Sequence, residues 1–220
     1  TENKAYIKNY EIYVQLEKFF LMEIIAHRIN KLSELKALPR KYGSEIDLRS
    51  YGSKIILNHD PYKTGDKLED YLANYDHGTL ILNIKESGLE YEAIKLAKKY
   101  KIKNFFLLDV EMPFICINKK KINKYMSIRF SEYEPIETIL KFKNNVGWIW
   151  IDTFKTLPIS KKNSLIIKRF NSCLVCPERW GRASDISKYF KVLKKIKFLP
   201  NSVMTNLKYA KKWENLILNF

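Results

Sequence analysis

The chain has 220 residues, of which 46% are hydrophobic and 14% aromatic, with only seven glycines and seven prolines. This composition excludes a disordered or low-complexity protein and predicts a substantial core, in one domain or at most two small ones. The formal net charge of +16 is compatible with a polyanionic partner, although it also fits a general bias toward lysine, and no arginine-rich nucleic-acid motif stands out.

Apolar segments rich in Ile, Val, Phe and Trp alternate with segments of helical periodicity along the chain. The predicted strands lie at about 22–28, 43–49, 79–85, 104–110, 125–131, 146–152, 172–177 and 198–205, with a return arm at 53–59. The predicted helices lie at about 31–41, 66–75, 88–100, 113–123, 134–143, 160–170, 182–196 and 207–218. Such alternation is typical of α/β proteins with a parallel sheet.

Eight strand-helix units predict a single (β/α)8 barrel, with a short β-hairpin excursion after the second strand; a doubly wound open sheet is the competing fold. We expect the barrel to span residues 21–220 and residues 1–20 to form an N-terminal extension. Nearly every predicted strand ends in polar residues: His27 and Arg28, Glu45 and Asp47, Asn83 and Lys85, Asp109, Arg129 and Glu132, Asp152, Glu178, Thr205 and Asn206. A barrel gathers these ends around one mouth, where the active sites of this fold lie.

The three cysteines, Cys116, Cys173 and Cys176, are too few for a disulfide framework, and Cys173-x-x-Cys176 lacks the second pair of a zinc site. The apolar run at 19–25 is short and interrupted by Glu23, so it predicts neither a membrane span nor a signal peptide. We therefore expect a cytoplasmic protein without a transmembrane segment.

Glu45 and Asp47 are two residues apart on a predicted strand, so their carboxylates leave the same face. Two adjacent like charges are unfavourable unless the face is open to water or a cation lies between them. A further group, His59-Asp60-Pro61, follows the return arm. Histidines and paired carboxylates at neighbouring strand ends indicate a catalytic site.

The segments "AHR" (26–28), "GSEIDLR" (43–49), "IILNHDP" (55–61), "KLEDYL" (67–72) and "LNIK" (82–85) resemble, in this order, the motifs of the glycerophosphodiester phosphodiesterases. The barrel of that family is shared with the phosphatidylinositol-specific phospholipases C. The resemblance covers mainly residues 22–86, with weaker support from "VMTN" near the C-terminus.

The resemblance implies that His27 and His59 are the general acid and base of phosphodiester cleavage. It further implies that Glu45 and Asp47 hold a divalent metal, Mg²⁺ or Ca²⁺, and that Lys85 faces the phosphate. This chemistry is reasonable independently, because a hard cation held by oxygen ligands neutralises the charge that builds during attack on a phosphodiester.

The chain departs from the family pattern at two positions. Ile29 stands where the family usually has glycine, which predicts a different first loop. Asn83 stands where the family usually has an acidic third metal ligand; its amide oxygen can coordinate a hard metal but carries no charge. Asp109, Asp152 and Glu178 are candidates for additional residues at the mouth.

Arg28 of the first motif and Arg129 in the second half of the chain are candidate phosphate contacts. Trp150 and Trp180 are candidates for stacking on a sugar or lipid headgroup. The structural alternatives are an Arg129 paired with an acid such as Glu132 or Glu178, and tryptophans placed in the core or barrel wall.

These observations predict a metal-dependent phosphodiesterase that cleaves a glycerophosphodiester or a related small phosphodiester, including one linked to a surface glycan. The alternative is a catalytically silent barrel that binds a polyanion, nucleic acid or membrane, with nucleic acid the less favoured partner. The sequence leaves the oligomeric state open.

Overall fold

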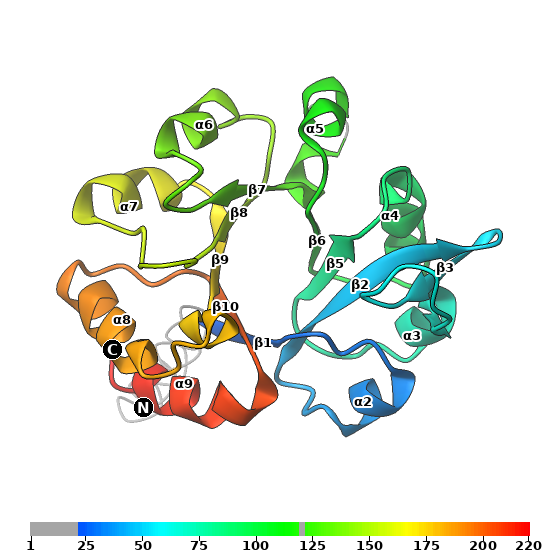
Figure 1. Ribbon diagram of the computed structural model, residues 1–220, viewed down its shortest axis with the longest axis horizontal. Coiled ribbons are helices and arrows are strands. Elements are labelled where there is room, and N and C mark those ends of the chain that lie inside the picture. The colour runs from blue at the N-terminus through cyan, green and yellow to red at the C-terminus, as the bar shows by residue number, and fades with distance from the viewer. Residues whose placement is uncertain (1–21, 119–121) are drawn as a thin grey trace, which may run out of the picture.

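The computed structural model describes residues 22–118 and 122–220. Eight parallel strands form a ring in chain order, and β10 pairs with β1 to return to its start (Figure 1). The strands are β1 (Glu23–Ala26), β2 (Gly43–Tyr51), β5 (Leu80–Ile84), β6 (Phe105–Leu108), β7 (Ser127–Phe130), β8 (Trp148–Ile151), β9 (Asn171–Val175) and β10 (Ser202–Thr205). The predicted (β/α)8 barrel is confirmed, and the open-sheet alternative is wrong.

The seam between β6 and β7 is joined by a parallel bridge between Leu107 and Met126. The Ser127 hydroxyl reinforces it by donating to the Leu107 carbonyl at 2.7 Å. The other neighbours around the ring pair over two to five residues.

Helices surround the ring, as Figure 1 shows. They are α2 (Leu32–Ala37), α3 (Leu68–Ala73), α4 (Glu90–Lys99), α5 (Met112–Asn118), α6 (Ile136–Lys141), α7 (Lys161–Ile167), α8 (Asp185–Lys195) and α9 (Ala210–Ile217). Three 3-10 helices accompany them: η1 (Asn123–Tyr125), η2 (Pro177–Trp180) and η3 (Leu207–Tyr209). In the parts of the chain that the structure describes, no helix is both long and apolar enough to cross a bilayer.

Several predicted boundaries are wrong. The helix expected at 31–41 ends at Ala37, because Pro39 follows and the residue before a proline disfavours helical geometry. The helix expected at 66–75 begins at Leu68, since Asp66–Lys67 form β4 against β3 (Lys54–Leu57).

Other corrections concern segment ends. The predicted strands at 125–131 and 198–205 narrow to β7 and β10, and the expected helix at 207–218 begins as η3. The helix expected at 113–123 is α5, and positions 119–121 lie outside the described residues, as does the expected extension at 1–20.

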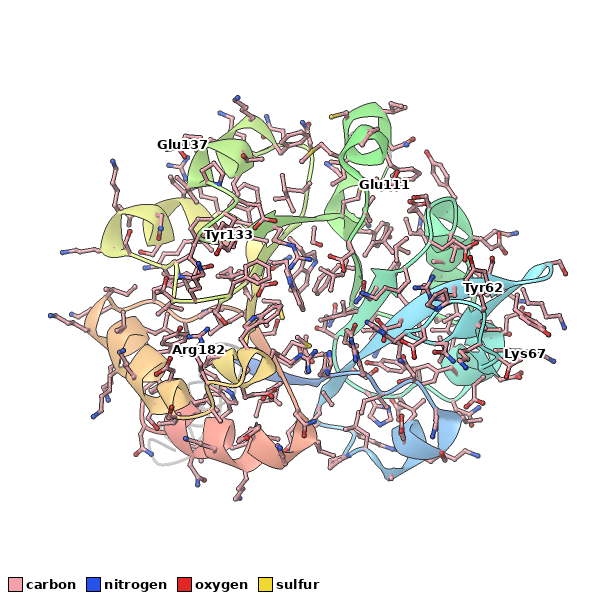
Figure 2. The ribbon with its side chains drawn as sticks, viewed as in Figure 1. Tyr62, Lys67, Glu111, Tyr133, Glu137 and Arg182 are labelled. Carbon is pink, nitrogen blue, oxygen red and sulfur yellow. The ribbon has the colours of Figure 1, made fainter. Side chains whose placement is uncertain are left out.

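The buried apolar side chains form two clusters, because successive residues of each strand point to opposite faces of the sheet. The inner cluster fills the ring and includes Ile25, Ile81, Phe106, Trp150 and Met204. The outer cluster lies between the ring and the helices, and Figure 2 shows side chains occupying both spaces. At roughly 25 cal/mol per Å² of apolar surface, burial on both faces of the strands is the main stabilising contribution. The inner side chains become polar toward the carboxyl ends of the strands, which places a polar mouth above an apolar floor.

Candidate active site

β2 places Glu45 and Asp47 on the inner face of the ring, as their spacing predicted. Both side chains are buried, and Asp47 lies opposite Asn83 in the register between β2 and β5. Burial, followed by the charge of Asp47, raises the pKa of Glu45 to about 7. A proton or a cation would therefore stabilise this pair of buried carboxylates. The alternative that this face of the strand is open to water is wrong.

The amide group of Asn83 partly stabilises the two carboxylates by donating hydrogen bonds to them. Its Nδ2 donates to Glu45 Oε1 at 2.8 Å and lies 3.3 Å from Asp47 Oδ1. Its Oδ1 is buried and has no hydrogen-bond partner among the described residues. Turning the amide by about 180° would exchange the two atoms and present this oxygen to the space between the carboxylates.

The oxygen donors fit a hard divalent cation. Two buried carboxylates and one amide oxygen are ligands of the kind that Mg²⁺ and Ca²⁺ prefer. Within residues 22–118 and 122–220, no group of three or more His, Cys, Asp or Glu side chains is arranged to hold a metal. The uncharged Asn83 is thus the third member of the candidate set, and we expect a weaker site than three carboxylates would give.

Two cations and a second amide surround Asp47. Lys85 Nζ lies 3.5 Å from Asp47 Oδ1, and Arg28 Nε lies 3.8 Å from Asp47 Oδ2. Asn30 Nδ2 donates to the same Oδ2 at 2.8 Å. Asn30 was missed from the sequence, although its position three residues after His27 places it in the same loop.

The first loop holds Arg28 in a left-handed conformation, with φ of 55°. The Arg28 amide donates to Glu45 Oε2 at 2.8 Å, and the Ile29 amide donates to the Glu45 carbonyl at 2.9 Å. Non-glycine residues rarely adopt this backbone conformation, which tends to occur at functional sites. The loop is therefore fixed directly above the β2 carboxylates, with Ile29 buried against the core.

His27 lies beside the carboxylates, with Nε2 3.9 Å from Glu45 Oε2. Burial is the main cause that lowers the pKa of His27 to about 3, and the charges of Arg179 and Arg28 lower it further. The ring is therefore neutral at neutral pH.

His59 reaches the same mouth by a different route. β3 runs antiparallel to the outer half of β2, and the Asn58 amide donates to the Asp47 carbonyl at 3.0 Å. His59 Nδ1 lies 2.9 Å from Asp60 Oδ1, and this hydrogen bond lowers the pKa of the Asp60 carboxyl. An aspartate so placed orients the ring.

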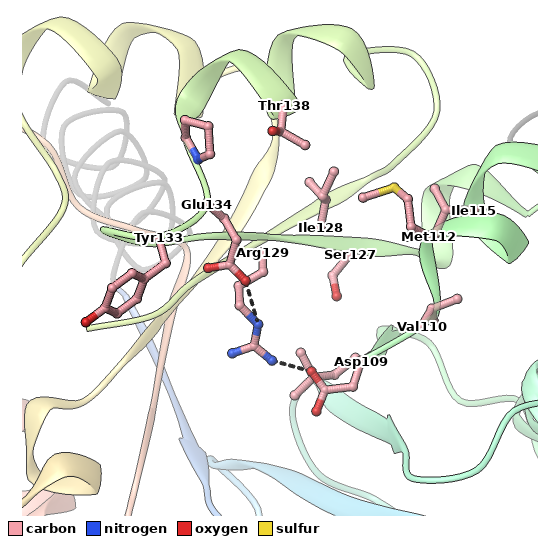
Figure 3. A pocket seen from close by; sticks show the side chains of 12 residues that line it. Asp109, Val110, Met112, Ile115, Ser127, Ile128, Arg129, Tyr133, Glu134 and Thr138 are labelled. Carbon is pink, nitrogen blue, oxygen red and sulfur yellow. Dashed lines mark hydrogen bonds and ion pairs between the residues drawn. The ribbon is translucent and has the colours of Figure 1, made fainter. Parts of the chain in front are cut away.

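Arg129 lies on the other side of the mouth and is surrounded by acids. Its guanidinium pairs with Asp152 and with Asp109, and its Nε lies 3.5 Å from Glu134 Oε1. Figure 3 shows the pairs with Asp109 and Glu134. These acids differ from the Glu132 and Glu178 considered from the sequence. A cavity of about 470 Å³ opens next to this cluster between β6 and β7, and Tyr133 at its rim lies nearer the middle of the ring than Glu137 of α6 (Figure 2).

Two other candidate acids have defined contacts. Asp109 has φ of 58° and also lies 3.3 Å from Lys85 Nζ through Oδ2. Glu178 accepts the Asn206 amide at 2.7 Å and so ties the end of β9 to the end of β10. The structure therefore gathers one group of side chains at the mouth: His27, His59, Glu45, Asp47, Asn83, Lys85 and Arg28. Arg129 and Asp152 form a second group, and Asp109 lies between the two, in contact with both Lys85 and Arg129.

The tryptophans divide between core and mouth. Trp150 is 4% exposed inside the ring, so its predicted stacking on a ligand is wrong. Trp180 is 45% exposed, and its Nε1 donates to Asp152 Oδ1 at 3.0 Å. Cys176 is buried and accepts a hydrogen bond from Trp213 Nε1 at 3.3 Å.

Solved glycerophosphodiester phosphodiesterases share this architecture. The enzyme from Parabacteroides distasonis has 11% identity and a TM-score of 0.61, covering 90% of this chain and 87% of that chain. A phosphodiesterase from Oleispira antarctica, solved with its product sn-glycerol-3-phosphate, has 16% identity and a TM-score of 0.58, covering 90% and 97%. The enzyme from Agrobacterium tumefaciens has 11% identity and a TM-score of 0.58, covering 84% and 97%.

The same architecture also occurs with other chemistry. The tryptophan synthase α-subunit from Pyrococcus furiosus has 13% identity and a TM-score of 0.55, covering 91% of this chain and 98% of that chain. No protein-family model and no curated protein matches the sequence. The comparisons therefore establish a TIM barrel like that of the glycerophosphodiester phosphodiesterases, and function has to be argued from the site.

Proposed function

We propose that the protein is a metal-dependent phosphodiesterase acting on a glycerophosphodiester or a related small phosphodiester, including one linked to a surface glycan. The observation that carries this proposal is the convergence of two histidines, two buried carboxylates and two cations at the carboxyl ends of β1, β2, β3 and β5. Three solved phosphodiesterases with the same fold support it.

The proposed chemistry divides the proton transfers between the two histidines. His27, neutral at neutral pH, accepts the proton of the attacking hydroxyl as its oxygen bonds to phosphorus. His59, oriented by Asp60, donates a proton to the leaving alkoxide as the phosphorus–oxygen bond breaks. Each well-placed group of this kind contributes about 10²–10⁴-fold to the rate.

Charge neutralisation is the second requirement. Glu45, Asp47 and the Asn83 oxygen would hold Mg²⁺ or Ca²⁺, which supplies electrostatic stabilisation of the phosphate oxygens when bound. Lys85 and Arg28 place their positive charges at the same position, within 4 Å of Asp47. A contact of Arg129 with phosphate, the participation of Asp109, Asp152 and Glu178, and the cytoplasmic location remain predictions.

Hydrolysis of a chromogenic phosphodiester and of a panel of glycerophosphodiesters, with and without chelator, tests the proposal. We expect metal-dependent turnover that Glu45→Ala and His59→Ala each reduce by about 10²-fold or more. His77→Ala is the matched control, because His77 precedes β5 and contacts the Leu38 carbonyl far from the mouth. Equal turnover in all variants would remove the proposed site.

The bond from Asn83 to both carboxylates favours one alternative, a catalytically silent barrel that binds a polyanion, nucleic acid or an acidic membrane. In that case the amide and the neighbouring cations stabilise Glu45 and Asp47 without metal. Salt-sensitive binding of a polyanion by a protein that shows neither turnover nor metal binding would support this alternative.

A further inference from the structure

The 3-10 helix η2, at the end of β9, fixes three consecutive side chains in different directions. Glu178 is tied to β10, where its Oε1 accepts the Asn206 amide at 2.7 Å. Trp180 is tied to β8, where its Nε1 donates to Asp152 Oδ1 at 3.0 Å. Arg179 lies between these two anchors, so its backbone position above the mouth is set from both sides.

The backbone around η2 strengthens this arrangement. The Arg179 amide donates to the Cys176 carbonyl at 3.0 Å, and the helix ends at Gly181 with φ of 75°. Glycine adopts this left-handed conformation without the steric cost that other residues have. The 3-10 helix η2 therefore ends at Trp180, and the half-buried Arg179 side chain lies at the mouth.

Arg179 differs from the other arginines near the mouth in its partners. Arg28 lies beside Asp47, Arg129 pairs with three acids, and Arg182 lies 3.1 Å from Asp185. Arg49 donates to main-chain carbonyls. Among the described residues, the Arg179 guanidinium has no hydrogen-bond or ion-pair partner, so its charge is left available for an anion.

The charge of Arg179 acts on the proposed reaction centre. After burial, Arg179 contributes most to the lowered pKa of His27, ahead of Arg28 and Lys85. Around the ring, the order is β9 with Arg179, β10, β1 with His27, β2, and β5 with Lys85. His27 is thus flanked by Lys85, which has acid partners, and by Arg179, which has none in residues 22–118 and 122–220.

We propose that Arg179 binds the non-bridging oxygens of the substrate phosphodiester from the β9 side of the mouth, opposite Lys85. This assignment rests on the proposed phosphodiesterase function and adds a contact from the second half of the barrel. A guanidinium presents paired donors that match phosphate oxygens in a plane, whereas a lysine supplies a single point charge. Arg179 therefore orients the diester and stabilises the negative charge that grows on these oxygens during attack.

The test compares Arg179→Ala and Arg179→Lys with the wild-type protein. We measure kcat and KM on a chromogenic phosphodiester with metal present, and the Kd of inorganic phosphate by calorimetry. Arg179→Ala should lower kcat/KM by about 10²–10³-fold. It should also weaken phosphate binding by about tenfold, with partial recovery in Arg179→Lys.

Arg169→Ala is the matched control, because Arg169 is exposed just before β9, at the opposite end of the barrel, and its loss changes the net charge equally. Phosphate affinity and kcat/KM that remain within about twofold of wild type in Arg179→Ala would overturn the assignment. An equal loss in Arg169→Ala would overturn it too, since the effect would then come from overall charge. Thermal melting of each variant verifies that the fold is retained.

The phosphate measurement separates this inference from the proposed function. If the wild-type protein hydrolyses no diester, and Arg179→Ala binds phosphate more weakly than wild type, the anion site is supported and the phosphodiesterase proposal fails. If the wild-type protein turns over and Arg179→Ala behaves like wild type, only the Arg179 assignment fails. A wild-type protein that binds no phosphate overturns the assignment directly.

Discussion

Replacing Asn83 by aspartate tests how the buried carboxylates are stabilised. The substitution keeps the shape of the side chain but removes the Nδ2 group that donates to Glu45 at 2.8 Å and approaches Asp47 at 3.3 Å. It also adds a third negative charge at a position that is 6% exposed. We expect Asn83→Asp to destabilise the metal-free protein and to increase its response to divalent metal.

The magnitude follows from the two contacts. A hydrogen bond to a charged group contributes about 1.5–3 kcal/mol, and the 3.3 Å contact is the weaker of the two, so we expect a total loss of about 2–4 kcal/mol. For a chain of this size, each kcal/mol corresponds to roughly 2–4 °C in Tm, which gives a fall of roughly 4–16 °C. Bound metal should recover part of this loss, because a ligand that binds only the folded state stabilises it in proportion to RT ln(1 + [L]/Kd).

The assay is thermal unfolding of both proteins in chelator and in a series of Mg²⁺ and Ca²⁺ concentrations. Asn171→Asp is the charge-matched control, because Asn171 is exposed at the beginning of β9, far from the mouth. An Asn83→Asp protein that melts like wild type in chelator would refute the stabilising role of the amide. A metal-induced shift no larger than that of wild type would refute the assignment of position 83 as a metal ligand.

Two further predictions concern charges elsewhere in the barrel. Burial raises the pKa of Glu23 despite its hydrogen bonds from Thr79, so this carboxyl favours folding below its ordinary pKa and loses that contribution as pH rises through its raised folded-state pKa. The Tm of Glu23→Gln relative to wild type should therefore increase from about pH 4 to pH 7, and a pH-independent difference would contradict this. Arg129→Met should lower the free energy of unfolding by about 3 kcal/mol, because its acid partners lose their shared cation. Denaturant titration measures this loss, and a stability equal to that of wild type would contradict it.

The local sequence was enough to predict the barrel and the part of the site that contains Glu45, Asp47 and His27. Strand periodicity places Glu45 and Asp47 on one face, and repeated strand-helix units bring the carboxyl ends of the strands to one mouth. The proximity of His27 to these carboxylates follows from the order of the first two strands, which the structure pairs in parallel. These features depend on periodicity and chain order, which can be read without knowing any long-range contact.

Only the tertiary structure determined which side chains pair with each charged group. The Asn83 amide lies between Glu45 and Asp47 because the β2 and β5 register sets Asp47 beside it, and no local pattern specifies that register. For the same reason the acid partners of Arg129 could not be named from the sequence, since they come from three separate segments. Whether an arginine pairs with an acid is likewise a tertiary property, because folding decides which acids come near it. In the part of the chain that the structure describes, no acid pairs with the Arg179 guanidinium.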